Sequence, residues 1–205
     1  MFTGIVQGVA TIAEVTRTQD IVKLEVEFPK GALESLRQGA SISIDGCCLT
    51  VTSFSKTTAI FDLVPETVAK TTFRERKVGS RVNYERSLKL GEEIGGHILS
   101  GHVDVVASIS SLEAGDKSRV VTFRVEREWT KYLFVKGYVA INGASLTITG
   151  VNNHSGEFTV SLIPETLAMT NLGEARAGDC VNIEIDRNTQ AIVDTVERFM
   201  SLQRQ

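Results

Sequence analysis

Hydrophobic and polar residues alternate along much of this chain, in short runs separated by turn residues. The runs IVKLEVEF (residues 21–28) and VVTFRV (residues 120–125) both follow a period of two. This period, with Val, Ile, Thr and Phe enriched, is typical of β-strands that cover one side of a core. The dipeptides Asp45-Gly46 and Asn142-Gly143 are strong signals for tight hairpin turns. The pattern therefore predicts an all-β fold.

Four sequence blocks occur twice, in the same order. TGIVQGVATI from Thr3 matches SGHVDVVASI from Ser100, and IDGCCLTV from Ile44 matches INGASLTI from Ile141, both at an offset of 97 residues. After a slip of two residues, DLVPETVAKTT matches SLIPETLAMTN, and VGSRVNYE matches AGDCVNIE. Repetition of this kind indicates a tandem duplication of one structural unit.

Each repeat has room for about six short strands, and closing them into a barrel leaves no exposed strand edge. We therefore expect tandem duplicated six-stranded Greek-key β-barrels plus a C-terminal α-helix. The expected boundaries are 1–97 for the first barrel, 98–186 for the second and 187–205 for the helix. Segments 29–37 and 65–70 begin with proline, which favours a first helical turn in each.

The segment after Asp186 has no partner in the first repeat. It carries apolar residues at helical spacing, namely Ile192, Val193, Val196, Phe199 and Met200. Two interpretations of this stripe stay open. The helix packs on its own barrel, or it forms a seam shared with other subunits.

Composition narrows the range of partners. The formal charge is -3 and 42% of the residues are hydrophobic, so neither nucleic acid nor an anionic membrane is an expected partner. No secretory leader and no membrane span are expected. Cys47 and Cys48 are adjacent and Cys180 is isolated, which differs from the spacing of metal-binding pairs. We expect free thiols in a reducing cytoplasm and no metal.

Several features together resemble the riboflavin synthase family. They are the opening MFTGIVQG, the paired GCCLTV and GASLTI blocks, EIGGHILSGHV, two PET segments and the terminal helix, over nearly all 205 residues. The resemblance implies a cytoplasmic transferase without metal or organic cofactor. Its reaction would be the last step of riboflavin biosynthesis, in which two molecules of 6,7-dimethyl-8-ribityllumazine give riboflavin and 5-amino-6-(ribitylamino)pyrimidinedione by four-carbon transfer. It also implies a homotrimer with active sites between the N-barrel of one subunit and the C-barrel of a neighbour. Association with lumazine synthase is left open.

Positions at which the two repeats differ are the candidates for catalysis. Ile5 corresponds to His102, and Cys48 corresponds to Ser145. Histidine exchanges protons near neutral pH, so His102 is the natural proton carrier. For the nucleophile, Cys48, Ser145, Thr50 and water all stay open. The structural alternatives are a hydrogen-bonded histidine and a small buried cysteine. The candidate catalytic residues are therefore His102, Cys48 and Ser145, together with Thr147 and Thr50, which are the same in both repeats. The resemblance adds Ser41, Asp186 and Phe2, which match positions near the family's site.

The resemblance also assigns substrate-binding residues to the two barrels. Those of the N-barrel pocket are Gly4, Ile5, Val6, Cys48, Leu49, Thr50, Asp62, Leu63, Val64, Pro65, Glu66 and Thr67. Those of the C-barrel pocket are Gly101, His102, Val103, Lys136, Ser145, Leu146, Thr147, Ser161, Leu162, Ile163, Pro164, Glu165 and Thr166. Glu66 and Glu165 are candidate partners for ribityl hydroxyls, or else solvated carboxylates in a first helical turn.

Other reactive side chains receive no catalytic role. Cys47 and Cys180 are expected in the cores. His97 is interpreted as structural, although its place in the inter-barrel connection would let it approach the site, and His154 lies in a turn. The sequence also admits two rival functions. One is a non-catalytic lumazine- or flavin-binding antenna protein of bioluminescence. The other is a flavin module of an oxidoreductase, which the lack of a GxGxxG segment disfavours.

Overall fold

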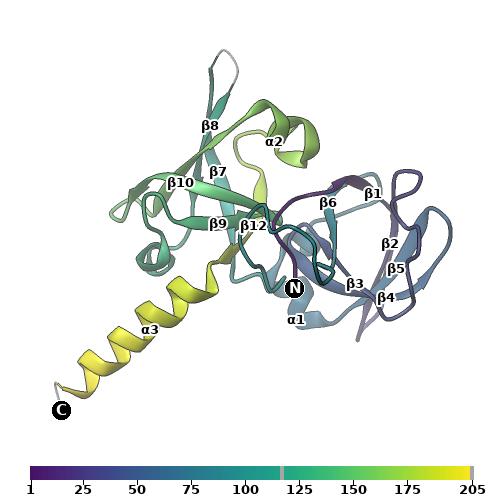
Figure 1. Cartoon of the computed structure of the whole chain (residues 1–205), viewed down its shortest axis with the longest axis horizontal. Helices are drawn as coiled ribbons and strands as arrows, with labels where there is room; N and C mark the ends of the chain where they lie inside the picture. Colours follow the sequence, from purple (N-terminus) through teal and green to yellow (C-terminus); the bar gives the residue numbers. More distant parts are fainter. Residues whose placement is uncertain (116–117, 204–205) are drawn as a thin grey trace.

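The computed structural model describes residues 1–115 and 118–203, which form two barrels followed by a long helix (Figure 1). The N-barrel is a closed antiparallel barrel with strands in the order β1-β2-β5-β4-β3-β6. Its strands are β1 (Gly8–Arg17), β2 (Val22–Glu27), β3 (Ser41–Ile44), β4 (Cys47–Phe54), β5 (Thr58–Leu63) and β6 (Arg81–Arg86). A short helix α1 (Pro65–Lys70) and a 3₁₀ turn η1 (Thr72–Arg74) connect β5 to β6.

The C-barrel repeats this arrangement. Its strands are β7 (Val105–Ala114), β8 (Arg119–Arg124), β9 (Tyr138–Ile141), β10 (Ala144–Asn152), β11 (Glu157–Leu162) and β12 (Cys180–Ile185). The connecting helices are η2 (Arg127–Tyr132), α2 (Pro164–Met169) and η3 (Asn171–Gly173), and α3 (Arg187–Leu202) follows the barrel. The offset is 97 residues from β1/β7 to β4/β10 and 99 from β5/β11 onward, so the two-residue slip lies in the β10–β11 hairpin. The predicted fold class is confirmed.

Of the two helical segments predicted from prolines in the first repeat, only one is a helix. Pro65 begins α1, as predicted. The prediction of a helical turn over residues 29–37 was wrong, because this stretch forms successive turns bonded from residue i to i+3 and no α-helix. Ser35 interrupts it with a φ of 57°, which a right-handed helix cannot contain.

Alternate strand residues fill each barrel. The N-barrel core includes Ile12, Leu24, Ile42 and Phe61, and the C-barrel core includes their counterparts from the second repeat, Ile109, Val121, Val139 and Val160. Intervening residues on the same strands face outward. The period-two pattern therefore decides which side chains lie on the outer surface of each barrel and are available to a ligand.

The two predicted hairpin turns lie back to back between the barrels. Asp45 and Gly46 have φ angles of 45° and 81°, and Asn142 and Gly143 have 46° and 81°, the paired positive values of a type I′ turn. A Cβ atom on Gly46 would lie 2.7 Å from the backbone nitrogen of Gly143. Glycine is therefore required at Gly46 by both the turn geometry and the close approach of the barrels.

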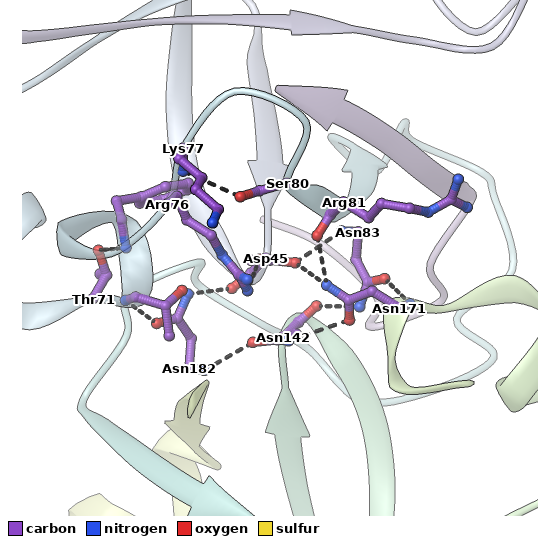
Figure 2. A network of polar contacts seen from close by, with 12 residues as sticks. Asp45, Thr71, Arg76, Lys77, Ser80, Arg81, Asn83, Asn142, Asn171 and Asn182 are labelled. Carbon is purple, nitrogen blue, oxygen red and sulfur yellow. Dashed lines mark hydrogen bonds and ion pairs between the residues drawn. The ribbon is translucent and has the colours of Figure 1, made fainter. Parts of the chain in front are cut away.

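Reciprocal hydrogen bonds join the barrels around these turns (Figure 2). Asn83 Nδ2 donates to the Asn142 carbonyl at 2.9 Å, and the equivalent Asn182 donates to the Asp45 carbonyl at 2.8 Å. One pair breaks the symmetry: Arg76 donates to the fully buried Asp45 at 2.6 Å, whereas the counterparts of these residues in the second repeat are Ala175 and Asn142. Burial raises the pKa of Asp45, and the positive charge of Arg76 opposes that shift.

Helix α3 projects away from both barrels (Figure 1). Its first turn is capped by Asp186, whose carboxylate accepts from the Thr189 amide at 2.8 Å. Lys131 and Tyr132 of η2 contact Glu197 and Asp194 of α3. The remaining face of the helix exposes Ile192, Val196, Phe199, Met200 and Leu202. Most of the predicted apolar stripe is therefore exposed in a single chain, and only Val193 packs against the barrel core.

Candidate active site

Two short arms are exchanged between the barrels. We define the N-arm as residues 2–6 and the central arm as residues 99–103. They pair with each other where Phe2 and Leu99 exchange backbone hydrogen bonds of 2.9 and 3.0 Å. Val6 of the N-arm then enters the core of the C-barrel, and Val103 of the central arm packs on the core of the N-barrel. Each arm thus precedes the first strand of one barrel but covers the other.

The exchange regroups the predicted pocket residues. The Ser145 amide of β10 donates to the Gly4 carbonyl at 2.8 Å, and the Cys48 amide of β4 donates to the Gly101 carbonyl at 2.7 Å. The assignment of Gly4, Ile5 and Val6 to the N-barrel pocket is therefore wrong, because these residues lie against the C-barrel. For the same reason, Gly101, His102 and Val103 lie against the N-barrel.

We call the surface formed by Cys48, Thr50 and the adjacent His102 the N-surface. Cys48 is half-buried and Thr50 exposed on the outer face of β4, while Cys47 and Leu49 between them point into the N-barrel core. His102 is exposed on the central arm. Burial raises the pKa of the neighbouring Cys47 thiol to about 12. Of the two adjacent thiols, Cys48 is therefore the one available for surface chemistry.

We call the surface formed by Ser145, Thr147 and Ile5 the C-surface. Here Nδ1 of His97 lies 2.6 Å from Oγ of Ser145. The His97 ring is buried and stacks on Tyr138, with centroids 5.2 Å apart and an interplanar angle of 18°. Burial lowers the pKa of His97, which keeps its ring neutral near pH 7, and the charge of Asp186 acts in the opposite direction.

His97 is thus placed directly beside a candidate catalytic residue. Sequence comparison missed this contact because residue 97 lies in the connection, outside the duplicated blocks. Two signals were available: the place of His97 in the inter-barrel connection, and the Gly95-Gly96 pair, which permits close approach of the backbone. A Cβ atom on Gly96 would lie 2.7 Å from the Ser145 Cβ.

The predicted binding residues that flank the two surfaces alternate between exposed and buried positions along their strands. Asp62, Val64 and Glu66 are exposed beside the N-surface, and Ser161, Ile163 and Glu165 are exposed at the equivalent positions of the second repeat. Four of the other predicted binding residues point into the cores and offer a ligand only their backbone: Leu49, Leu63, Leu146 and Leu162. Pro65, Thr67, Pro164 and Thr166 lie in the short helices. Glu66 pairs with Lys70 at 2.7 Å, and this contact lowers the pKa of Glu66.

Four further predicted residues have well-defined local roles. Phe2 is fully buried between the barrels with Leu99. The Ser41 carbonyl accepts from the Ser87 hydroxyl at 2.8 Å, and Asp186 caps α3. Lys136 adopts a φ of 72° next to β9, and its side chain is exposed. Phe2 and Asp186 therefore position the chain around the two surfaces.

The two surfaces lie open in a single chain. A cavity of about 420 Å³ lies elsewhere between the barrels and is lined by the η1 and η3 regions, including Arg76 and Asn171. Within residues 1–115 and 118–203, no group of three or more His, Cys, Asp or Glu side chains is arranged to hold a metal ion. None of the helices in these ranges combines the length and apolar character that crossing a bilayer requires.

Comparison with known proteins gives a consistent result. The lumazine binding domain family matches residues 3–87 and again 100–186. The chain is 43% identical to riboflavin synthase of Escherichia coli over 202 residues, covering 98% of this chain and 94% of that protein. It is 38% identical to riboflavin synthase of Bacillus subtilis, covering 91% and 85% respectively.

Solved structures agree with this similarity. LumP complexed with riboflavin superposes with a TM-score of 0.84 at 29% identity, covering 91% of this chain and 100% of that one. LumP complexed with 6,7-dimethyl-8-(1'-D-ribityl) lumazine gives 0.82 at 28% identity with the same coverage.

Proposed function

Because the chain belongs to the riboflavin synthase family of transferases, we propose that it dismutates 6,7-dimethyl-8-ribityllumazine. Two molecules of this substrate would yield one riboflavin and one 5-amino-6-(ribitylamino)pyrimidinedione. Four carbon atoms pass from donor to acceptor, and the two products together contain every atom of the two substrates. The reaction therefore needs no external oxidant or reductant.

The observation that carries the proposal is the pair of similar but chemically different surfaces. Two copies of one heterocycle need two sites of the same shape, which the duplicated barrels provide. Transfer between them requires the sites to act differently, and the repeats differ at Cys48/Ser145 and at Ile5/His102. Holding two reactants in a fixed orientation can contribute about 7–11 kcal/mol to lowering the barrier in ideal cases.

On the N-surface, His102 is our candidate to carry the proton released from the acidic 7-methyl group of one substrate. Acid–base assistance of this kind contributes about 10²–10⁴-fold in rate. Cys48 lies beside it and is one candidate nucleophile toward the ring carbon of the second substrate. Ser145, paired with the neutral His97 on the C-surface, is a second candidate, and Thr50 and water are the others. Glu66 and Glu165 are candidate partners for the ribityl chains.

A single chain leaves both surfaces open to water, so we infer that each site closes against another subunit. Helix α3 supports this inference, because Val196, Phe199 and Met200 are exposed on it while its polar face contacts η2. An exposed apolar stripe on a projecting helix is stabilised by burial against equivalent helices. We propose a homotrimer in which the N-surface of one subunit faces the C-surface of the next, functioning in the cytoplasm.

The direct test incubates the pure protein with 6,7-dimethyl-8-ribityllumazine and follows the absorbance of riboflavin. The proposal predicts one riboflavin for every two molecules of substrate consumed. Variants His102→Ala and Cys48→Ala should retain slow turnover, because both substrates would still be held together. Stoichiometric binding without product would overturn the proposal and favour a non-catalytic binding protein, the antenna alternative weighed from the sequence.

A further inference from the structure

Arg187 is the first residue of α3. Its guanidinium binds the central arm at His102, the candidate proton acceptor. Its Nη2 atom donates to the His102 carbonyl at 2.6 Å, and Nη1 donates to Asp104 at 2.8 Å. Nε donates to the Ser100 hydroxyl at 3.3 Å. One guanidinium therefore spans three alternate residues of the same segment, a task suited to its planar set of donors.

The duplication provides an internal comparison for this contact. In both repeats a buried glutamate anchors the arm in the same way. Glu85 accepts from the Thr3 and Gly4 amides at 2.6 and 3.0 Å. Glu184 accepts from the Ser100 and Gly101 amides at 2.7 and 2.9 Å. Anchoring of the arms as such is therefore complete without an arginine.

The two repeats differ one residue later along each arm. At the offset of 99 residues, the counterpart of Arg187 is Leu88, which cannot hold a carbonyl group through its side chain. The counterpart of His102 is Ile5. The extra clamp thus occurs only in the repeat that carries a histidine at the exposed arm position.

The equivalent glycines Gly4 and Gly101 have nearly the same φ, 75° and 78°, so it is the histidine that makes an extra clamp useful in the central arm. Gly101 has a φ of 78°, and glycine adopts that region and others with little energetic preference. His102 follows it, and its own side chain is exposed. A misplacement of about 1 Å in a reacting group can lower a rate by about 10²-fold, so a fixed carbonyl at His102 restricts where its ring can lie.

We propose that Arg187 is a positioning residue that fixes His102 for proton transfer, an inference that rests on the proposed function. Arg187 acts through the backbone carbonyl of His102. Since it is also the first residue of α3, it links the orientation of that helix to the N-surface.

The kinetic test is a double-mutant cycle with Arg187→Met and His102→Gln. Arg187→Met should lower kcat about 10-fold and change KM by less than about 2-fold. In the His102→Gln background the same change should lower kcat by less than about 2-fold, because the group that Arg187 positions is already gone. Arg187→Lys should recover part of the loss. Equal losses in both backgrounds, or none in either, would overturn the inference.

The matched control is Arg17→Met. Arg17 also donates hydrogen bonds to several backbone carbonyls, those of Phe73, Arg74 and Arg76, at 3.2–3.4 Å. These contacts lie on the N-barrel, away from both surfaces. The kcat of this variant should stay within about 2-fold of the parent. Light scattering on Arg187→Met should give the parent oligomeric state, and a loss of assembly together with activity would overturn a role through His102.

A readout without catalysis separates this inference from the proposed function. The chain has three histidines, so the ring signals of ¹⁵N-histidine-labelled protein can be assigned with single variants. Arg187→Met should shift or broaden the His102 signal and leave those of His97 and His154 in place. An unchanged His102 signal would overturn the inference. Absence of riboflavin formation by the parent protein would instead count against the proposed function.

Discussion

Oγ of Ser145 and Nδ1 of His97 lie 2.6 Å apart, although His97 comes from the connection between the repeats and Ser145 from the middle of β10. The contact is partly buried, with the His97 ring itself buried and the Tyr138 ring stacked against it. A neutral imidazole can share a proton with a hydroxyl in either direction. The pair therefore couples the C-surface to the protonation state of a group that burial keeps uncharged.

This pair predicts a specific pH dependence of stability. Because burial lowers the pKa of His97 in the folded state, the unfolded chain binds a proton first as the pH falls through about 6.5. Folding stability should therefore fall on acidification, by less than about 1.4 kcal/mol per pH unit from this group. The free energy of unfolding of the parent relative to His97→Gln should decrease between pH 7.5 and pH 5.5. A difference that stays constant over this range would contradict the assignment.

The adjacent thiols should differ sharply in reactivity. Cys47 is buried with a pKa of about 12, so on the order of 10⁻⁴ of it is thiolate at pH 8. Cys48 is half-buried on the outer face of β4, and its amide donates to the carbonyl of Gly101, the residue before His102. We expect iodoacetamide to label Cys48 first, as mapped by mass spectrometry, and a bound lumazine to protect it. Faster labelling of Cys47, or labelling of Cys48 unaffected by the ligand, would contradict the placement of the N-surface.

Glycine at the inter-barrel turn should be far harder to replace than glycine in an open turn. Gly46→Ala would place a methyl group 2.7 Å from a backbone atom of the other barrel, whereas Gly79, with a similar φ of 86°, has no atom within 4 Å. We expect Gly79→Ala to destabilise by about 1 kcal/mol from backbone strain alone. Gly46→Ala should destabilise by about 3 kcal/mol or more, because the barrels must separate. Urea unfolding measures both, and equal losses would refute the close packing.

The Arg76–Asp45 pair should show strong non-additivity. Arg76→Ala leaves a fully buried carboxylate without its counter-charge, which destabilises by about 3–5 kcal/mol. Adding Asp45→Asn to that variant recreates the Asn142 and Ala175 arrangement of the other repeat and should restore part of the stability. Unfolding in urea at pH 7 is the measurement. A double variant less stable than Arg76→Ala alone would show that the pair is not an isolated electrostatic unit.

Local sequence patterns were sufficient to predict most of the fold. The Asp45-Gly46 turn and the helix at Pro65 follow from patterns that operate over a few residues, and the offset of 97 residues with its later slip follows from comparing the two repeats. Residues 29–37 were mispredicted because a leading proline permits a helix but does not require one.

The exchange of the arms could not be predicted in this way. Val6 and Val103 are apolar residues in equivalent blocks, and the pattern is the same whether each fills its own barrel or the other. The His97–Ser145 contact and the Arg187 clamp join segments 48 and 85 residues apart. Such contacts depend on tertiary packing, which a single sequence does not encode in its local periodicity.

The most direct test of the two-surface account is activity complementation between blocked subunits. Thr50→Trp fills the N-surface and the equivalent Thr147→Trp fills the C-surface, so each variant alone should be inactive. If each site joins the N-surface of one subunit to the C-surface of the next, co-refolded mixtures at a 1:1 ratio should regain about a quarter of the parent activity, since one interface in four then carries two open surfaces. Mixed assemblies that form but stay inactive would contradict the account.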